Sequence, residues 1–104
     1  MILGLDIGGT KTALILGDRT GAVRARRQFP TPLHLGPHAA VEQIASAAQD
    51  FLVAEGASGL EAAGVSIGGP LDSVAGVILG PPHLPGWNNI PLRAMLEERL
   101  GVAV

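Results

Sequence analysis

The stretch Leu3-Gly4-Leu5-Asp6-Ile7-Gly8-Gly9-Thr10-Lys11-Thr12 decides how this chain folds. Residues 1–7 are almost continuously apolar, which predicts a strand buried on both faces. The two glycines end that strand, and residues 12–16 favour a second strand. This order brings a carboxylate, free backbone N–H groups, a hydroxyl and an ammonium to one strand end. Such a set suits a polyphosphate that carries a metal ion.

Three other interpretations of the glycine pair compete with this one. The dinucleotide-binding fingerprint and the P-loop both need a helix after the glycines, whereas a strand is expected here. Thr10 also stands where a P-loop has its lysine. An ordinary hairpin stays open, because Gly-Gly is a favoured two-residue turn and Asp6 can hydrogen-bond it. A carboxylate alone repels phosphate, so Asp6 fits the phosphate interpretation only with Mg²⁺ between the two.

Composition limits the classes of protein. The 104 residues are 47% hydrophobic and 3% aromatic, which predicts one domain with an aliphatic core. A net charge of −2 provides no basic field, so we expect neither nucleic acid nor a membrane as a partner. Cysteine is absent, which excludes disulfides and thiolate metal sites within the chain. Without a membrane-spanning run or a signal peptide pattern, we expect a cytoplasmic protein.

The remaining pattern predicts an α/β fold. Five runs of β-type residues are expected as strands: 1–7, 12–16, 22–29, 62–67 and 77–79. Short turns join the first three, which predicts an antiparallel three-strand meander at the start of a mixed sheet. Two helices, each opening at a proline (Pro37 and Pro91), are expected to pack on the sheet. Residues 102–104 are expected to begin a further strand.

Three segments together resemble one family. Asp6-Ile7-Gly8-Gly9-Thr10-Lys11 resembles the first phosphate motif of the ROK family (repressors, open reading frames and kinases), part of the actin-like ATPase superfamily. Residues 64–72 resemble the family's Gly-rich strand and turn, and residues 82–92 resemble its Pro-Asn-Leu-Pro-Gly-Trp segment. The three motifs occur in order over nearly the whole chain, which makes the resemblance specific. It implies that residues 1–104 are the N-terminal lobe of an actin-like (ribonuclease H-like) ATPase fold, ending before the catalytic aspartate.

The resemblance also implies a function, namely glucokinase-like phosphorylation of a hexose by ATP in the complete protein. The residues implied to bind ATP are Asp6, Gly8, Gly9, Thr10 and Lys11, with Asp6 as the residue next to Mg²⁺. The residues implied to line the hexose site are Gly69, His83 and Asn88. The family's general base, adenosine pocket and Cys/His zinc motif lie further along, so this fragment alone is expected to be inactive. A homo-oligomer is expected for the complete protein.

Departures from the family pattern leave alternatives open. Gly68 stands where the family usually has proline, and Ser66 where it usually has glycine. His83 replaces an asparagine that contacts a sugar hydroxyl in the family, and imidazole has a different reach, so the sugar stays undetermined. The alternatives are a sugar-sensing transcriptional regulator and a non-catalytic sugar-binding lobe. Family regulators carry a helix-turn-helix before the first strand. Since Met1 leads directly into that strand, the kinase is favoured.

Several conspicuous residues are expected to have structural roles. Trp87 is expected to anchor its loop by packing rather than to stack on sugar. Asn89 is expected to cap the second helix, and Asp72 its own turn. Arg99 is expected on an exposed helix face.

Overall fold

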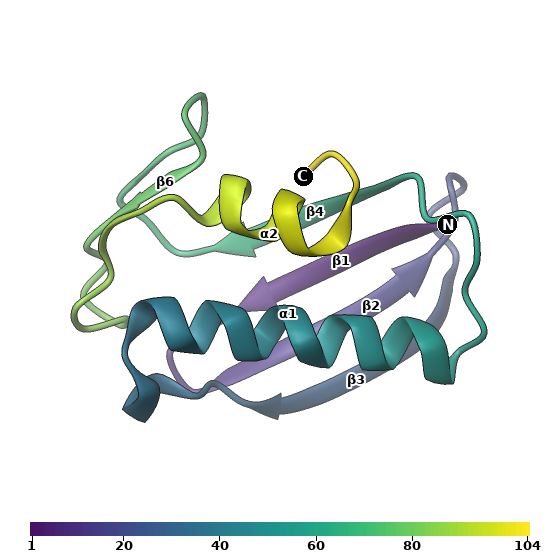
Figure 1. The fold of residues 1–104 in the computed structure, drawn as a ribbon, viewed down its shortest axis with the longest axis horizontal. Coiled ribbons are helices and arrows are strands. Elements are labelled where there is room, and N and C mark those ends of the chain that lie inside the picture. The colour runs from purple at the N-terminus through teal and green to yellow at the C-terminus, as the bar shows by residue number, and fades with distance from the viewer.

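A four-stranded mixed sheet forms the centre of the computed structural model, which describes all residues from Met1 to Val104 (Figure 1). The strand order is β3-β2-β1-β4. These strands are β1 (Ile2–Ile7), β2 (Lys11–Gly17), β3 (Val23–Pro30) and β4 (Ala62–Ile67). The first three form the predicted antiparallel meander, and β4 lies parallel to β1. The parallel pairing brings the carboxyl ends of β1 and β4 to the same edge.

Both helices cover one face of this sheet (Figure 1). A short 3₁₀ helix, Leu33–Leu35, precedes α1 (Pro37–Ala54), which has proline at its first position, as predicted, and Gly36 as its N-cap. The second helix, α2 (Leu92–Leu100), ends at Gly101, whose left-handed backbone suits glycine. The apolar stripe of α1 is buried against the sheet through Ala40, Val41, Ile44, Ala45, Ala48 and Phe51. Neither helix has both the length and the apolar character that a membrane span requires.

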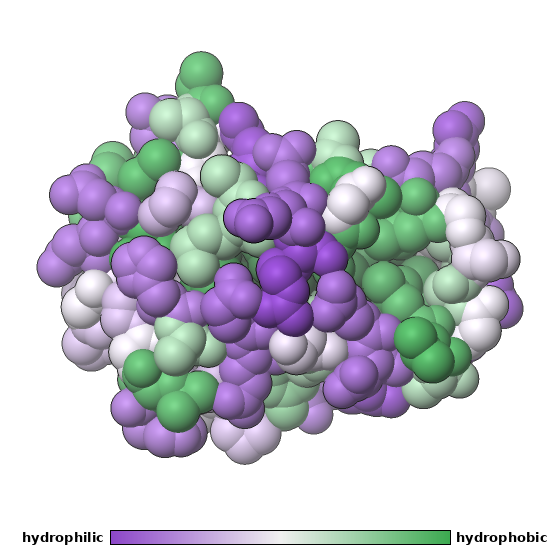
Figure 2. All heavy atoms as spheres, viewed as in Figure 1, coloured by the Kyte–Doolittle hydropathy of each residue, from purple (hydrophilic) through white to green (hydrophobic).

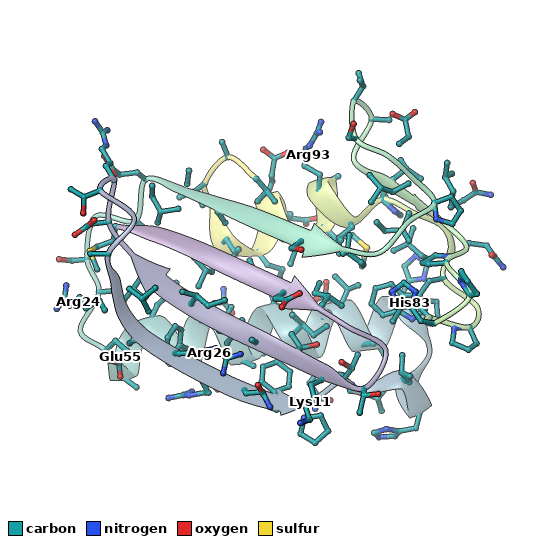
Figure 3. All side chains as sticks on the ribbon, turned by 180° about the vertical axis from the view of Figure 1, so that it is seen from behind. Lys11, Arg24, Arg26, Glu55, His83 and Arg93 are labelled. Carbon is teal, nitrogen blue, oxygen red and sulfur yellow. The ribbon has the colours of Figure 1, made fainter.

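The opposite face of the sheet carries no helix (Figure 3). In β1 the side chains of Leu3, Leu5 and Ile7 are buried toward the helices, whereas Asp6 is exposed. The prediction that β1 is buried on both faces is therefore wrong, because no element of this chain packs on the second face. This arrangement leaves the Asp6 carboxylate accessible at the end of its strand.

A second, three-stranded sheet follows β4 and was only partly predicted. It consists of β5 (Leu71–Asp72), β6 (Val77–Leu79) and β7 (Asn88–Ile90), in that order. Asp72 Oδ1 accepts hydrogen bonds from the N–H groups of Val74 and Ala75 at 3.0 Å, which confirms its role in the turn. The predicted Asn89 cap is wrong: α2 has no side-chain cap, and Asn89 adopts a left-handed φ of 52°.

Arg99 joins the two helices, which corrects its assignment to an exposed face. Its guanidinium donates to Ser46 Oγ at 2.8 Å and Gln49 Oε1 at 3.0 Å, and it pairs with the Glu42 carboxylate. Figure 2 views the molecule from the side on which the helices lie, and it shows hydrophilic residues across the middle of that side. Beyond α2, Ala103 forms a parallel bridge with Ala62 at the edge of β4, in agreement with the strand start expected there.

Candidate functional site

The turn between β1 and β2 is an incomplete hairpin. The Gly8 N–H donates to the Lys11 carbonyl at 2.9 Å. In a regular two-residue hairpin the Lys11 N–H returns a bond to the Gly8 carbonyl, but here that bond is absent. The Gly8 carbonyl instead accepts the Thr31 hydroxyl at 2.7 Å. The glycine pair therefore departs from the ordinary hairpin that the dipeptide alone allows.

This departure leaves backbone donors free. The N–H groups of Gly9 and Thr10 donate no hydrogen bond within the chain. Thr10 is exposed and Gly9 is half-buried, so both groups lie near solvent. Adjacent unpaired N–H groups at a turn form the kind of concavity that holds an anion.

Glycine is required in this region by close packing rather than by a left-handed backbone. Neither Gly8 nor Gly9 has a positive φ, and the same is true of Gly68. A Cβ on Gly8 would lie 2.9 Å from the Lys11 carbonyl oxygen. A Cβ on Gly9 would approach the His83 carbonyl oxygen more closely than 3.0 Å, and one on Gly68 would overlap the His83 ring. His83 therefore packs against both glycine turns.

The loop that carries His83 is held from beneath. Leu84 and Trp87 are completely buried, which confirms the predicted packing role of Trp87. The indole Nε1 of Trp87 has no hydrogen-bond partner. His83, which precedes Leu84 in this loop, is itself exposed. Figure 3 shows Lys11 and His83 at the same end of the sheet, toward which β1 and β4 point.

Asp6 and Lys11 share the open face of the sheet. Asp6 pairs with Ala13 across the β1–β2 ladder, and Lys11 lies two residues before Ala13 on the same face. Across the parallel ladder, Asp6 pairs with Ser66 of β4. Both Asp6 and Lys11 are exposed, and neither takes part in an ion pair. One unpaired carboxylate and one unpaired ammonium thus flank the free N–H groups.

Mg²⁺ fits this set of donors when phosphate is present. No group of three or more His, Cys, Asp or Glu side chains converges to hold a metal ion. Mg²⁺ is commonly bound through one or two carboxylates, with substrate phosphates and water completing its coordination. Asp6 is suited to that role, because its carboxylate is exposed at the strand end beside the turn.

The predicted sugar-site residues are brought together only in part. Gly69 is exposed and follows Gly68, the glycine that contacts the His83 ring, and its peptide bond to Pro70 is cis. Asn88 lies in β7, where its side-chain oxygen packs over Gly80. Asn88 forms no hydrogen bond with the glycine turn at residues 8–11.

Two threonines that support the turn were missed. Thr12 and Thr31 are buried, and their hydroxyls lie 2.8 Å apart. Thr31 also donates its N–H to the Thr10 carbonyl at 2.9 Å. A threonine between Pro30 and Pro32 gives no sequence signal for such a contact. The Thr12 hydroxyl on a buried strand face was a usable signal, since a buried polar group needs a partner.

The side chains whose pKa values are shifted lie at the end of the sheet opposite the glycine turn. Arg19 hydrogen-bonds Glu61 at 2.5 Å, and this bond lowers the pKa of the Glu61 carboxyl. The Thr20 hydroxyl similarly lowers the pKa of Asp18 in the β2–β3 turn. Both pairs are exposed and close the ends of strands; they are structural contacts remote from the glycine turn.

The fold is that of an actin-like ATPase lobe: a mixed sheet opens with an antiparallel meander, and helices pack on that sheet. The chain belongs to the ROK family, whose sequence profile matches residues 2–104. It is 31% identical to the glucokinase of Streptomyces coelicolor over 104 residues, which are 100% of this chain and 31% of that protein. The chain therefore spans about a third of the length of such relatives.

Solved structures agree with this assignment. The ROK hexokinase of Thermus thermophilus superposes with a TM-score of 0.85 at 38% identity, covering 99% of this chain and 33% of that one. A ROK glucokinase of Streptomyces griseus, in complex with glucose and AMPPNP, superposes with a TM-score of 0.84 at 28% identity. The match covers 99% of this chain and 31% of that one. A ROK transcriptional regulator shares the fold, with a TM-score of 0.87 at 16% identity over 99% of this chain and 26% of that one.

Proposed function

We propose that the complete protein transfers the γ-phosphate of ATP to a hexose in the cytoplasm, and that this chain supplies the phosphate-binding turn and part of the hexose site. The observation that carries the proposal is the unpaired N–H groups of Gly9 and Thr10, flanked by Asp6 and Lys11. The complex of the Streptomyces griseus relative with glucose and AMPPNP supports the same pairing of ligands.

Each residue of the turn has a role that its chemistry allows. The free N–H groups and the Lys11 ammonium stabilise negative charge on the transferred phosphoryl group and its neighbours. Asp6 is the residue that would hold Mg²⁺, and the ion would supply positive charge against the phosphates when bound. Catalysis of this type depends mainly on positioning and charge stabilisation rather than on covalent chemistry. We assign the general base to the remainder of the complete protein.

The acceptor side of the site centres on His83. The His83 backbone lies against Gly9 of the phosphate turn, and its imidazole lies against Gly68 of the neighbouring turn. An acceptor hydroxyl bound at this imidazole would therefore be near the phosphate turn, as transfer requires. Imidazole offers one hydrogen-bond donor and one acceptor in its neutral form, which suits a sugar hydroxyl. Gly69 and Asn88 are proposed to shape the same side, Gly69 by leaving space and Asn88 through its amide.

The test compares the complete protein with Asp6→Asn and a matched control, Asp50→Asn. Asp50 is an exposed carboxylate on α1 without an ion pair. A coupled assay with Mg-ATP and a hexose panel, including glucose and N-acetylmannosamine, measures kcat. We expect Asp6→Asn to lose about 100-fold or more in kcat, as when other charge-stabilising groups are removed. Asp50→Asn should retain the wild-type rate.

Two results would contradict the proposal in different ways. A wild-type turnover in Asp6→Asn would remove Asp6 from the mechanism. A complete protein that binds hexose but transfers no phosphate would instead favour the sugar-sensing regulator or a non-catalytic lobe. The free N–H groups beside Lys11 favour the kinase, since a sugar sensor has no need of a phosphate cradle.

A further inference from the structure

A buried chain of hydroxyl groups ends on the phosphate turn. The Thr31 hydroxyl lies 2.7 Å from the Gly8 carbonyl and 2.8 Å from the Thr12 hydroxyl. A carbonyl only accepts, so the single Thr31 hydroxyl proton goes to Gly8. Thr12 must then donate to Thr31. The chain of donors therefore runs in one direction, from Thr12 through Thr31 to the turn.

Thr31 holds the turn at a second point. Its own N–H donates to the Thr10 carbonyl at 2.9 Å. Both carbonyls that accept from Thr31 belong to the turn, and Thr31 is only 8% exposed. The two contacts come from one residue at the end of β3, so they fix the turn relative to the sheet.

These two contacts decide where the N–H groups that follow the two carbonyls point. In a trans peptide the C=O and the following N–H point in opposite directions, and the peptide bonds of this turn are trans. Because the Gly8 carbonyl faces Thr31, the Gly9 N–H faces away from Thr31. Likewise, because the Thr10 carbonyl faces Thr31, the Lys11 N–H faces away from it. The Gly9 N–H is not paired within the chain.

We propose that Thr31 is a positioning residue for the phosphate-binding turn, which it holds through the Gly8 and Thr10 carbonyls so that the Gly9 N–H group is presented to phosphate. The inference rests on the proposed function and adds a residue outside the glycine motif. Thr31 touches neither substrate; it acts on nucleotide binding through the two peptide planes. Its loss should therefore affect ATP and leave the hexose largely unaffected.

The test uses the complete protein with Thr31→Val, Thr31→Ser and Val41→Ala. The valine variant keeps the shape and removes both hydroxyl bonds, whereas serine restores the hydroxyl. Val41 is buried in α1, so Val41→Ala loosens the core without contacting the turn. We expect Thr31→Val to raise the KM for Mg-ATP by about tenfold, the order for losing one good hydrogen bond. The hexose KM should stay within about twofold.

The pattern across variants separates positioning from general stability. Thr31→Ser should return the ATP KM to within about threefold of wild type, and Val41→Ala should leave both KM values unchanged. An unchanged ATP KM in Thr31→Val, an equal rise in both KM values, or the same effect in Val41→Ala would overturn the inference. A wild type that transfers no phosphate would overturn the proposed function, and the inference with it.

A second variant covers a folding failure. If Thr31→Val gives no folded protein, Thr12→Val removes the donor to Thr31 and leaves the Thr31 bond to Gly8. We then expect a two- to threefold rise in the ATP KM at constant hexose KM, as for one weakened hydrogen bond. No rise in the ATP KM would overturn the inference.

Discussion

Gly9→Ala should destabilise this chain because the added methyl group collides with backbone. The new Cβ would lie closer than 3.0 Å to the His83 carbonyl oxygen, and a carbonyl cannot rotate away as a flexible side chain can. Either the turn or the 81–87 loop must move. That loop is anchored by Leu84 and Trp87, both completely buried, so its movement disturbs the core.

The size of the effect follows from the cost of overpacking. Forcing one extra carbon into a packed site costs about 1–3 kcal/mol of the free energy of unfolding. For a domain of about 100 residues, each kcal/mol shifts Tm by roughly 4–8 °C. We therefore expect Gly9→Ala to lower Tm by roughly 4–24 °C, measured by circular dichroism, with a matching fall in the urea midpoint.

Gly64→Ala provides the matched control. Gly64 lies in β4, has no positive φ and has no atom within 4 Å of an added Cβ. Alanine in a strand is favoured over glycine by about 0.5–1 kcal/mol, so this variant should be as stable as wild type or slightly more stable. A Gly9→Ala chain that is as stable as Gly64→Ala would refute the close packing of His83 on the turn.

Three further predictions concern the rest of the fold. Trp87→Ala should lower the free energy of unfolding, measured in urea, by about 3–5 kcal/mol. Trp87→Phe should lower it clearly less, because the indole N–H has no partner to lose. Equal losses in the two variants would contradict this expectation. A double-mutant cycle on the half-exposed Arg99–Glu42 pair should give a coupling energy below about 1 kcal/mol, and a coupling of several kcal/mol would contradict it. Arg19 lowers the pKa of Glu61 from its ordinary 4.5, so the pair stabilises the fold above that pH and ceases to do so as pH falls through the lowered pKa. Glu61→Gln should therefore lower the urea midpoint slightly at pH 7 and not at strongly acidic pH; a difference that grows in acid would contradict the sign.

The central sheet could be predicted because its signals are local. Each of these signals depends on residues adjacent in sequence: the apolar run before Gly8, the turn at 17–21 and the proline that opens α1. The meander and the positions of both helices followed from those signals. The ROK assignment was also within reach, because three separate motifs keep their order along the chain.

The details of the site could not be predicted because they depend on contacts between distant segments. The sequence indicates that glycine is needed at Gly9, but it does not show that the neighbour is the His83 carbonyl. The short strands β5 and β7 contain only one apolar residue each, Leu71 and Ile90, so they give no strand signal, whereas all three residues of β6 are β-type or apolar. Thr31 contacts the turn only because β3 returns alongside β2, which places its hydroxyl against Gly8.

The most direct test of the central claim is a titration of ¹⁵N-labelled chain with Mg-ATP, followed by NMR, with adenosine as the control ligand. The account predicts saturable shifts of the Gly9, Thr10 and Lys11 amide signals with Mg-ATP and none with adenosine. The absence of such shifts at millimolar Mg-ATP, or equal shifts with adenosine, would contradict the assignment of this turn to phosphate.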